Sequence, residues 1–106
     1  MSRVLINVPK SCRKGEIFDV KVLISHPMES GQRRDEQGQI IPRKIINKFT
    51  CSLDGEEVFA ADLFPAIAAN PFLSFSARAE ASGTLSLSWV DDDGHVQTEL
   101  AAITVT

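Results

Sequence analysis

The sequence predicts an all-β protein, an immunoglobulin-like antiparallel β-sandwich of about seven strands. Apolar and polar residues alternate with a period of two along most of the chain, which is the pattern of strands with one buried face. Glycine-containing turns separate these segments, and no window of ten or more residues shows a helical period. A small closed barrel is the second architecture that suits the same pattern.

The expected strands follow one another along the chain, beginning with RVLINV at residues 3–8. A fourth strand follows the Asp54-Gly55 turn. In each of the other five strands the apolar residues share one face, and Trp89 is expected to fill the space between the sheets. The residues of these faces are Phe18, Val20, Val22 and Ile24, then Ile45, Phe49, Cys51 and Leu53 (with Asn47 as the polar exception), then Leu73, Phe75, Ala77 and Ala79, then Leu85, Leu87 and Trp89, and finally Ala101, Ile103 and Val105.

Three tight turns support this order of strands. Asp54-Gly55 is a two-residue hairpin turn, because both residue types tolerate a positive φ. The segment DDDG at residues 91–94 has the same chemistry, and ASG at residues 81–83 is the third turn. The acidic residues of DDDG also suggest calcium, but the spacing is not that of an EF-hand loop, and a solvated hairpin turn is expected.

Two segments exceed what an isolated sandwich needs. The connection at residues 25–43 is long, and connections beyond about 12–15 residues are usually functional or disordered. Residues 57–75 place several aromatic and aliphatic residues around two prolines. This apolar segment, with at most one turn of helix, either folds over an end of the sandwich or faces a partner.

The composition gives one domain, residues 1–106, with a formal charge of −3. Arginines and lysines are scattered, so nucleic acid is not an expected partner. No stretch is long and apolar enough for a membrane span, and the first residues lack a signal-peptide core. The residues alone therefore favour a cytoplasmic protein, or export by a means that the chain does not encode. Two cysteines allow one disulfide at most; we expect Cys12 and Cys51 to be free, and a bridge remains open.

Catalytic and metal-binding motifs are missing from the sequence. His26 and His95 are expected to be partly exposed and belong to no Ser-His-Asp order or G-x-S-x-G motif. The possible soft ligands Cys12, His26, Cys51 and His95 have no metal-site spacing. His-Pro-Met after a strand is similar to superoxide reductases, but their iron site uses four histidines and one cysteine, and this chain has two histidines. We expect no catalytic residue, metal or cofactor; the alternative is a metal-binding or redox enzyme on an immunoglobulin-like frame.

The polar insert at residues 25–44 is the best candidate for a binding surface. Apolar residues in a loop with no core to face, flanked by arginines, are typical of an interface centre. Arg33-Arg34 followed by Asp35-Glu36 also fits a self-neutralising loop tip. Including two aromatics of the apolar segment, the candidate partner-binding residues are Met28, Arg33, Arg34, Ile40, Ile41, Arg43, Phe64 and Phe72.

Several long motifs carry a family resemblance. SHPMESGQRRD, IPRKIINKFTC, ANPFLSF and WVDDDG resemble the SoxZ family of bacterial thiosulfate oxidation over nearly the whole chain. The resemblance implies a non-catalytic subunit that forms a heterodimer with SoxY, whose C-terminal Gly-Gly-Cys-Gly-Gly arm carries sulfur intermediates. It also implies transient contact with other Sox enzymes, and periplasmic residence through a partner that carries the signal peptide.

Two further possibilities remain open. The isolated chain could form a homodimer through the surface meant for SoxY. A general adhesion or chaperone-like sandwich is a third class of function, which would show strand exchange at an exposed edge.

Overall fold

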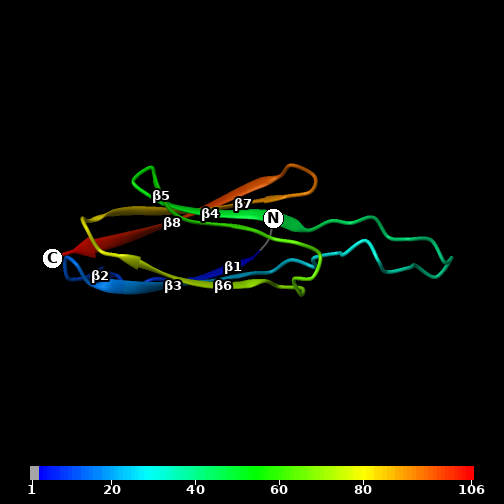
Figure 1. Cartoon of the computed structure of the whole chain (residues 1–106), viewed down its shortest axis with the longest axis horizontal. Coiled ribbons are helices and arrows are strands. Elements are labelled where there is room, and N and C mark those ends of the chain that lie inside the picture. Colours follow the sequence, from blue (N-terminus) through cyan, green and yellow to red (C-terminus); the bar gives the residue numbers. More distant parts are fainter. Residues whose placement is uncertain (1–2) are drawn as a thin grey trace.

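The computed structural model describes residues 3–106 as two β-sheets that face each other (Figure 1). The predicted all-β sandwich is confirmed, and no helix occurs among these residues. The strands are β1 (Val4–Asn7), β2 (Ser11–Cys12), β3 (Ile17–Ile24), β4 (Ile46–Leu53), β5 (Glu56–Asp62), β6 (Phe72–Arg78), β7 (Gly83–Asp91) and β8 (Val96–Val105).

The sheets are open at their edges and do not close into a barrel. One sheet has three strands in the order β1-β3-β6, and the other has five in the order β2-β8-β7-β4-β5. All pairs are antiparallel except β2 with β8, which is parallel. The strand missing from the sequence prediction is β2, because two residues are too few to show an alternating pattern.

The alternating residues form the core between the sheets. Phe49 of β4 is fully buried and lies at the centre of an aromatic cluster. Its ring centroid is 6.1 Å from that of Phe75 and 6.4 Å from that of Trp89, which is 3% exposed as expected. Phe59 of β5 and Phe75 of β6 stack at 4.2 Å. These rings join the two sheets on the side where β5 and β6 lie.

The Asp54-Gly55 turn has the predicted conformation. Both residues have positive φ, 49° and 86°. The Asp54 side chain adds a link to β7, since its Oδ1 accepts a 2.9 Å hydrogen bond from the Thr84 N–H. The turn therefore fixes the hairpin of β4 and β5 against the neighbouring strand.

Residues 25–44 extend away from the sandwich as a narrow projection, at the right of Figure 1. The molecule is consequently elongated, with extents of 59 × 20 × 19 Å. Residues 63–71 form a loop rather than a helix, with a turn closed by a 3.0 Å bond from the Ile67 N–H to the Phe64 carbonyl. Cys12 and Cys51 are buried free thiols. No helix that could span a membrane is present in residues 3–106.

The aromatic cluster should dominate the stability of the sandwich. We expect Phe49→Ala to lower the free energy of unfolding by about 3–5 kcal/mol, because it leaves a cavity between the sheets. The control Phe64→Ala, at a side chain that is 64% exposed, should change it by less than about 0.5 kcal/mol. Urea unfolding followed by tryptophan fluorescence measures both; equal losses would contradict this account of the core.

Candidate functional site

Residues 25–44, here called the arm, fold as a hairpin rather than a loose loop. Glu29 and Lys44 exchange two backbone hydrogen bonds of 2.9 Å. Farther out, the Ile41 N–H donates to the Arg33 carbonyl at 2.8 Å. Two extended segments joined by such bonds form an antiparallel projection.

Polar side chains fold the tip of the arm. The Asp35 Oδ1 accepts hydrogen bonds from the N–H groups of Gln37 and Gln39, both 2.9 Å long. Gly38, with a φ of 78°, allows the chain to reverse. The Arg34 guanidinium donates to the Gly38 carbonyl at 2.7 Å. Asp35 and Arg34 therefore stabilise the turn itself.

The expectation of a self-neutralising tip, in which Asp35 and Glu36 pair with Arg33 and Arg34, is wrong. Arg33 instead pairs with Glu29, with 2.6 Å between Nη2 and Oε1. The hydrogen bond from Arg33 is the main cause of the lowered pKa of the Glu29 carboxyl. The Arg33 side chain is still 66% exposed, so it remains accessible to a partner.

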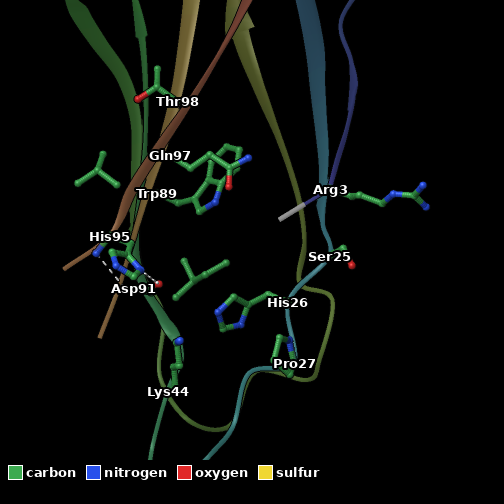
Figure 2. Close-up of a pocket in the computed structure, with 12 residues that line it drawn as sticks. Arg3, Ser25, His26, Pro27, Lys44, Trp89, Asp91, His95, Gln97 and Thr98 are labelled. Carbon is green, nitrogen blue, oxygen red and sulfur yellow. Dashed lines mark hydrogen bonds and ion pairs between the residues drawn. The ribbon is translucent and has the colours of Figure 1, made fainter. Parts of the chain in front are cut away.

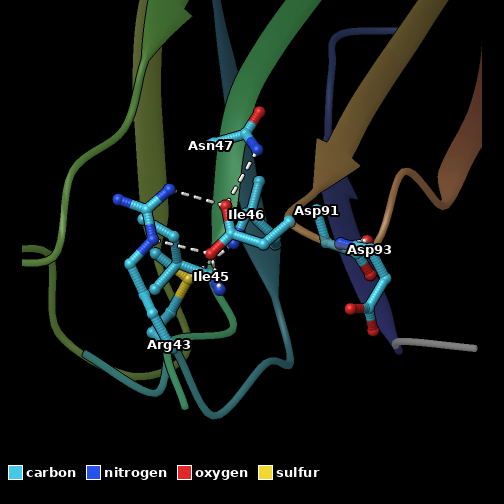
Figure 3. Close-up of polar contacts among 8 residues, drawn as sticks. Arg43, Ile45, Ile46, Asn47, Asp91 and Asp93 are labelled. Atoms are coloured by element: carbon cyan, nitrogen blue, oxygen red, sulfur yellow. Dashed lines mark hydrogen bonds and ion pairs between the residues drawn. The ribbon is translucent and has the colours of Figure 1, made fainter. Parts of the chain in front are cut away.

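Asp92, in the turn between β7 and β8, holds the base of the arm. Figure 3 shows its hydrogen-bond partners Arg43, Ile45 and Asn47, with the contacts as dashed lines. Its carboxylate accepts two hydrogen bonds of 2.8 Å from the Arg43 guanidinium. It also accepts bonds from the Ile45 N–H at 3.1 Å and from the Asn47 amide at 3.0 Å. We call Asp92, Arg43, Ile45 and Asn47 the arm base.

These contacts perturb the ionisation of Asp92. The hydrogen bond from Arg43, with smaller effects of Asn47 and Ile45, lowers the pKa of the Asp92 carboxyl from 3.8 to about 2. A carboxyl whose pKa is lower in the folded state than in the unfolded state stabilises the fold at any pH above its unfolded pKa. The contribution of the arm base is therefore complete above about pH 4 and is lost as the pH falls toward 2.

Met28 and His26 lie in the interior, which corrects two expectations. Met28, expected in a loop without a core, is 5% exposed, and its sulfur accepts a hydrogen bond from the Ile46 N–H at 3.3 Å. His26, expected to be partly exposed, is 8% exposed. At the start of the arm, a φ of 51° at Met28 directs its side chain into the core cluster. The residue pattern does not show this change of chain direction.

His26 joins the arm to the loop before β6. Its Nδ1 accepts a 2.9 Å bond from the Met28 N–H, so the neutral ring carries its proton on Nε2. Its own backbone N–H and carbonyl bond to Asn70, at 3.0 and 2.7 Å. Burial lowers the pKa of His26 below 6.5, so the ring stays neutral at neutral pH.

A hollow of about 920 Å³ lies beside the arm base, between the ends of the two sheets (Figure 2). His26 lines one side, and Asp91 and His95 line the other, with Trp89 between β7 and the hollow. The charges around it are mixed, since Lys44 and Asp91 both line it. No single ligand chemistry converges on this hollow.

The acidic turn brings together three side chains that could ligate a metal ion. Ligand atoms of Asp91, Asp93 and His95 lie within 4.8 Å of one another. The Asp91 Oδ1, however, already accepts bonds from the N–H groups of Asp93 and His95, at 2.9 and 3.0 Å. The iron site considered above needs four histidines, and this chain has two. The residues present do not fit that group.

An apolar row crosses the outer face of the three-stranded sheet. Leu5 of β1 lies opposite Leu23 of β3, which lies opposite Phe72 of β6. Leu5 is 69% and Phe72 60% exposed. Phe64 and Ile67, in the loop that leads into β6, are 64% and 40% exposed. We call Leu5, Leu23 and Phe72 the apolar row.

The candidate residues are thus divided among different places. Phe72 lies in the apolar row and Phe64 in the neighbouring loop, whereas Ile40, 55% exposed, and Ile41, half-buried, lie on the arm. Arg43 belongs to the arm base, and Met28 to the core. Sequence reasoning missed Leu5 and Leu23, because a row across three strands depends on their register.

The arm base should control how firmly the arm is held. We expect Asp92→Asn to speed tryptic cleavage after Arg33 and Arg34 severalfold, since an amide cannot accept the paired guanidinium bonds. The control is Asp93→Asn, which removes only an exposed ion pair with Lys44 and should leave the rate nearly unchanged. Equal cleavage rates in the two variants would show that Asp92 does not hold the arm.

His26 should make stability depend on pH. Its pKa is lower in the folded chain than the unfolded value of 6.5, so the unfolded state binds more protons and stability falls as the pH drops below about 6.5. His26→Asn keeps an acceptor for the Met28 N–H but does not titrate. Urea unfolding at pH 7 and pH 5 should therefore show a smaller loss for the variant, and an identical loss would refute this role of His26.

A family model described as "Sulphur oxidation protein SoxZ" matches residues 6–102. A comparison with curated protein sequences found no match.

Solved structures share the fold at low sequence identity. The superoxide reductase (neelaredoxin) from Ignicoccus hospitalis is 17% identical, with a TM-score of 0.78 over 99% of this chain and 82% of that one. The sulfur carrier protein SoxY from Chlorobium limicola f thiosulfatophilum is 16% identical, with a TM-score of 0.69 over 97% of this chain and 78% of that one. These likenesses show the sandwich fold. Because the family model spans nearly all of the sequence, the chain belongs to the SoxZ family of sulphur oxidation proteins.

Proposed function

We propose that this chain is the non-catalytic scaffold subunit of a sulfur-carrier complex, and that it pairs with SoxY as a heterodimer. The match to the SoxZ family over residues 6–102 carries the proposal. In this arrangement SoxY holds the sulfur intermediate on its cysteine arm, and the present chain is the fixed base that other Sox enzymes recognise transiently. Periplasmic residence, by export together with the partner, is part of the same proposal.

The potentially reactive side chains support a role without bond-making. Burial raises the pKa of the Cys51 thiol to about 11, which leaves little thiolate at neutral pH. Cys12 is also buried. The Nδ1 of His26 and the carboxylate of Asp92 are both engaged in holding the arm. Each of these groups has a structural task or is shielded from solvent.

The exposed apolar row supports a stable protein partner. Leu5 and Phe72 expose apolar side chains to water, which is unfavourable in free energy. Exposed apolar patches mark interaction sites. Aromatic side chains at such places often supply much of the binding energy. We assign this surface to SoxY, with Phe64 in the adjoining loop as a further contact.

The arm supports the second part of the role, which is recognition by enzymes. It projects from the sandwich and presents Arg33 and Ile40 in exposed positions. A projecting element that is held at its base loses less entropy on binding than a loose loop does. We assign Arg33, Arg34, Ile40 and Ile41 to contacts with client enzymes.

The partner surface can be tested by co-expression with SoxY and measurement of the dissociation constant. We expect Phe72→Ser to weaken binding at least about tenfold, because it removes an aromatic contact at the centre of the row. Ser74→Ala, at an exposed position of the same strand face, should bind as the parent chain does. Unchanged binding of Phe72→Ser would remove the row from the interface.

The whole proposal has a separate test. The chain should not bind sandwich proteins that are unrelated to SoxY. The double variant Arg33→Ala, Arg34→Ala should slow a coupled thiosulfate-oxidation assay, although SoxY should still co-purify with it. Failure of the parent chain to bind SoxY, or conversion of sulfur compounds by the purified chain alone, would overturn it. Metal analysis of the purified chain checks the alternative of a metal or redox enzyme.

A further inference from the structure

One edge of the five-stranded sheet has no neighbouring strand over most of its length. β7 pairs with residues 96–103 of β8 in an unbroken register. On its other side, β8 is covered by β2 only at Thr104 and Val105. Within residues 3–106, no strand lies against that side of residues 96–103.

The direction of the backbone groups at this edge follows from the last residues of the chain. The N–H groups of Thr104 and Thr106 point toward the β2 side, where they bond to Lys10 and Cys12 carbonyls at 2.9 and 3.0 Å. The Val105 N–H points the other way, to the Ser82 hydroxyl at 2.7 Å. Because alternate residues of a strand share an edge, the N–H and carbonyl groups of Thr98, Leu100 and Ala102 face the free edge.

This edge lacks the features that usually prevent strands from pairing. Natural sheets protect their edges by short strands, prolines, lysines or bulges. Three other edge strands have features that limit pairing. β1 has four residues and β2 has two. β5 has a bulge opposite Cys51/Ser52 and carries the acidic residues Glu56, Glu57 and Asp62. Residues 96–103 of β8 contain no proline, lysine or arginine. The other long unprotected edge, β6, begins at Phe72 of the apolar row.

The side chains beside the free edge are also suited to pairing. Leu100 is 68% and Val96 64% exposed on the outer face of the sheet. Thr98 and Ala102 lie on the same face as Leu100 and are uncharged. Glu99 is the single charged residue of residues 96–103.

We propose that the free edge of β8 pairs with the same edge of a second copy of this chain, antiparallel and centred on Leu100. In this register, Leu100 of each copy lies opposite Leu100 of the other and exchanges two backbone hydrogen bonds with it. Thr98 of each copy lies opposite Ala102 of the other. The two five-stranded sheets join into one sheet across a twofold axis.

The sequence of this edge fits its own copy. Centring on Leu100 places Glu99 of each copy opposite Ala101 of the other. The two Glu99 carboxylates therefore do not face each other, and the repulsion of directly opposed like charges is avoided. The two Leu100 side chains cover each other on the outer face, which accounts for an apolar side chain in such an exposed position. A twofold contact needs a self-complementary surface of this kind.

The edge is separate from the surface assigned to SoxY. β6 lies on the side that is closed by the stacked rings of Phe59 and Phe75. β8 lies on the other side, where Thr98 and Gln97 line the hollow with Arg3 and Ser25. The inference therefore goes beyond the proposed function, and a dimer through β8 leaves the Phe72 end of the apolar row, on β6, available.

The oligomeric state of the full purified chain, measured by sedimentation over a wide range of concentration, tests the pairing. We expect a reversible dimer whose dissociation constant rises at least about tenfold in Leu100→Lys, which places two cations opposite each other. Leu100→Pro should have a similar effect, because it removes the N–H that faces the partner but no bond to β7. Ser74→Lys, an equal change of charge on the other sheet, should leave the dimer intact.

A covalent probe tests the register. Leu100→Cys should give a disulfide-linked dimer under mild oxidation, since residues in a hydrogen-bonded antiparallel pair have Cα atoms about 5.5 Å apart, within disulfide range. The native cysteines are buried, and Ser74→Cys is the matched control. Circular dichroism and thermal unfolding of each variant show that the sandwich is retained.

Three results would overturn the proposal. They are a monomer at every concentration, a dimer that Leu100→Lys and Leu100→Pro leave unchanged, and Leu100→Cys cross-linking no better than Ser74→Cys. Loss of SoxY binding in the Leu100 variants without self-association of the parent chain would assign the edge to SoxY instead. SoxY binding by the Phe72→Ser variant reports on the proposed function separately.

Discussion

The carboxylate of Asp92 is the contact on which the functional part of the molecule depends. Its bonds to Arg43, Ile45 and Asn47 connect the turn between β7 and β8 with the returning side of the arm. A bidentate guanidinium–carboxylate pair fixes direction as well as distance. The arm therefore leaves the sandwich at a defined angle, and the exposed residues near its tip have a fixed place relative to the sheets.

A second constraint is the division of apolar residues between the core and the surface. The inner faces of both sheets are filled, with Phe49 and its neighbouring rings at the centre. Leu5, Phe72 and Leu100 nevertheless remain exposed, although removing apolar area from water is worth about 25 cal/mol per Å². These three residues do not contribute to the core, and they lie on an outer sheet face and at an unpaired edge.

The sequence predicted the strands well because each has a continuous alternation that depends on neighbouring residues alone. The Asp54-Gly55 turn was predictable for the same reason, since its conformation is local. Met28 was misjudged because its burial depends on where the arm turns, and Asn47, the polar exception on its strand face, is explained only by Asp92, 45 residues away. The apolar row likewise requires the pairing of β1, β3 and β6. Local patterns thus give the elements, whereas the site is made of contacts between distant segments.

The same fold occurs in a sulfur carrier protein and in superoxide reductases, so the sandwich by itself does not decide between chemistry and binding. The decision lies in what each protein adds to it. In this chain, the histidine at the entrance to the arm is buried and accepts a backbone hydrogen bond, and the acidic turn beside it is used to hold the arm. His26 and Asp92 are thus both engaged in structural contacts. The exposed features include backbone at one edge, an apolar row on one face and a charged arm at one end, which are three surfaces suited to contact with other proteins.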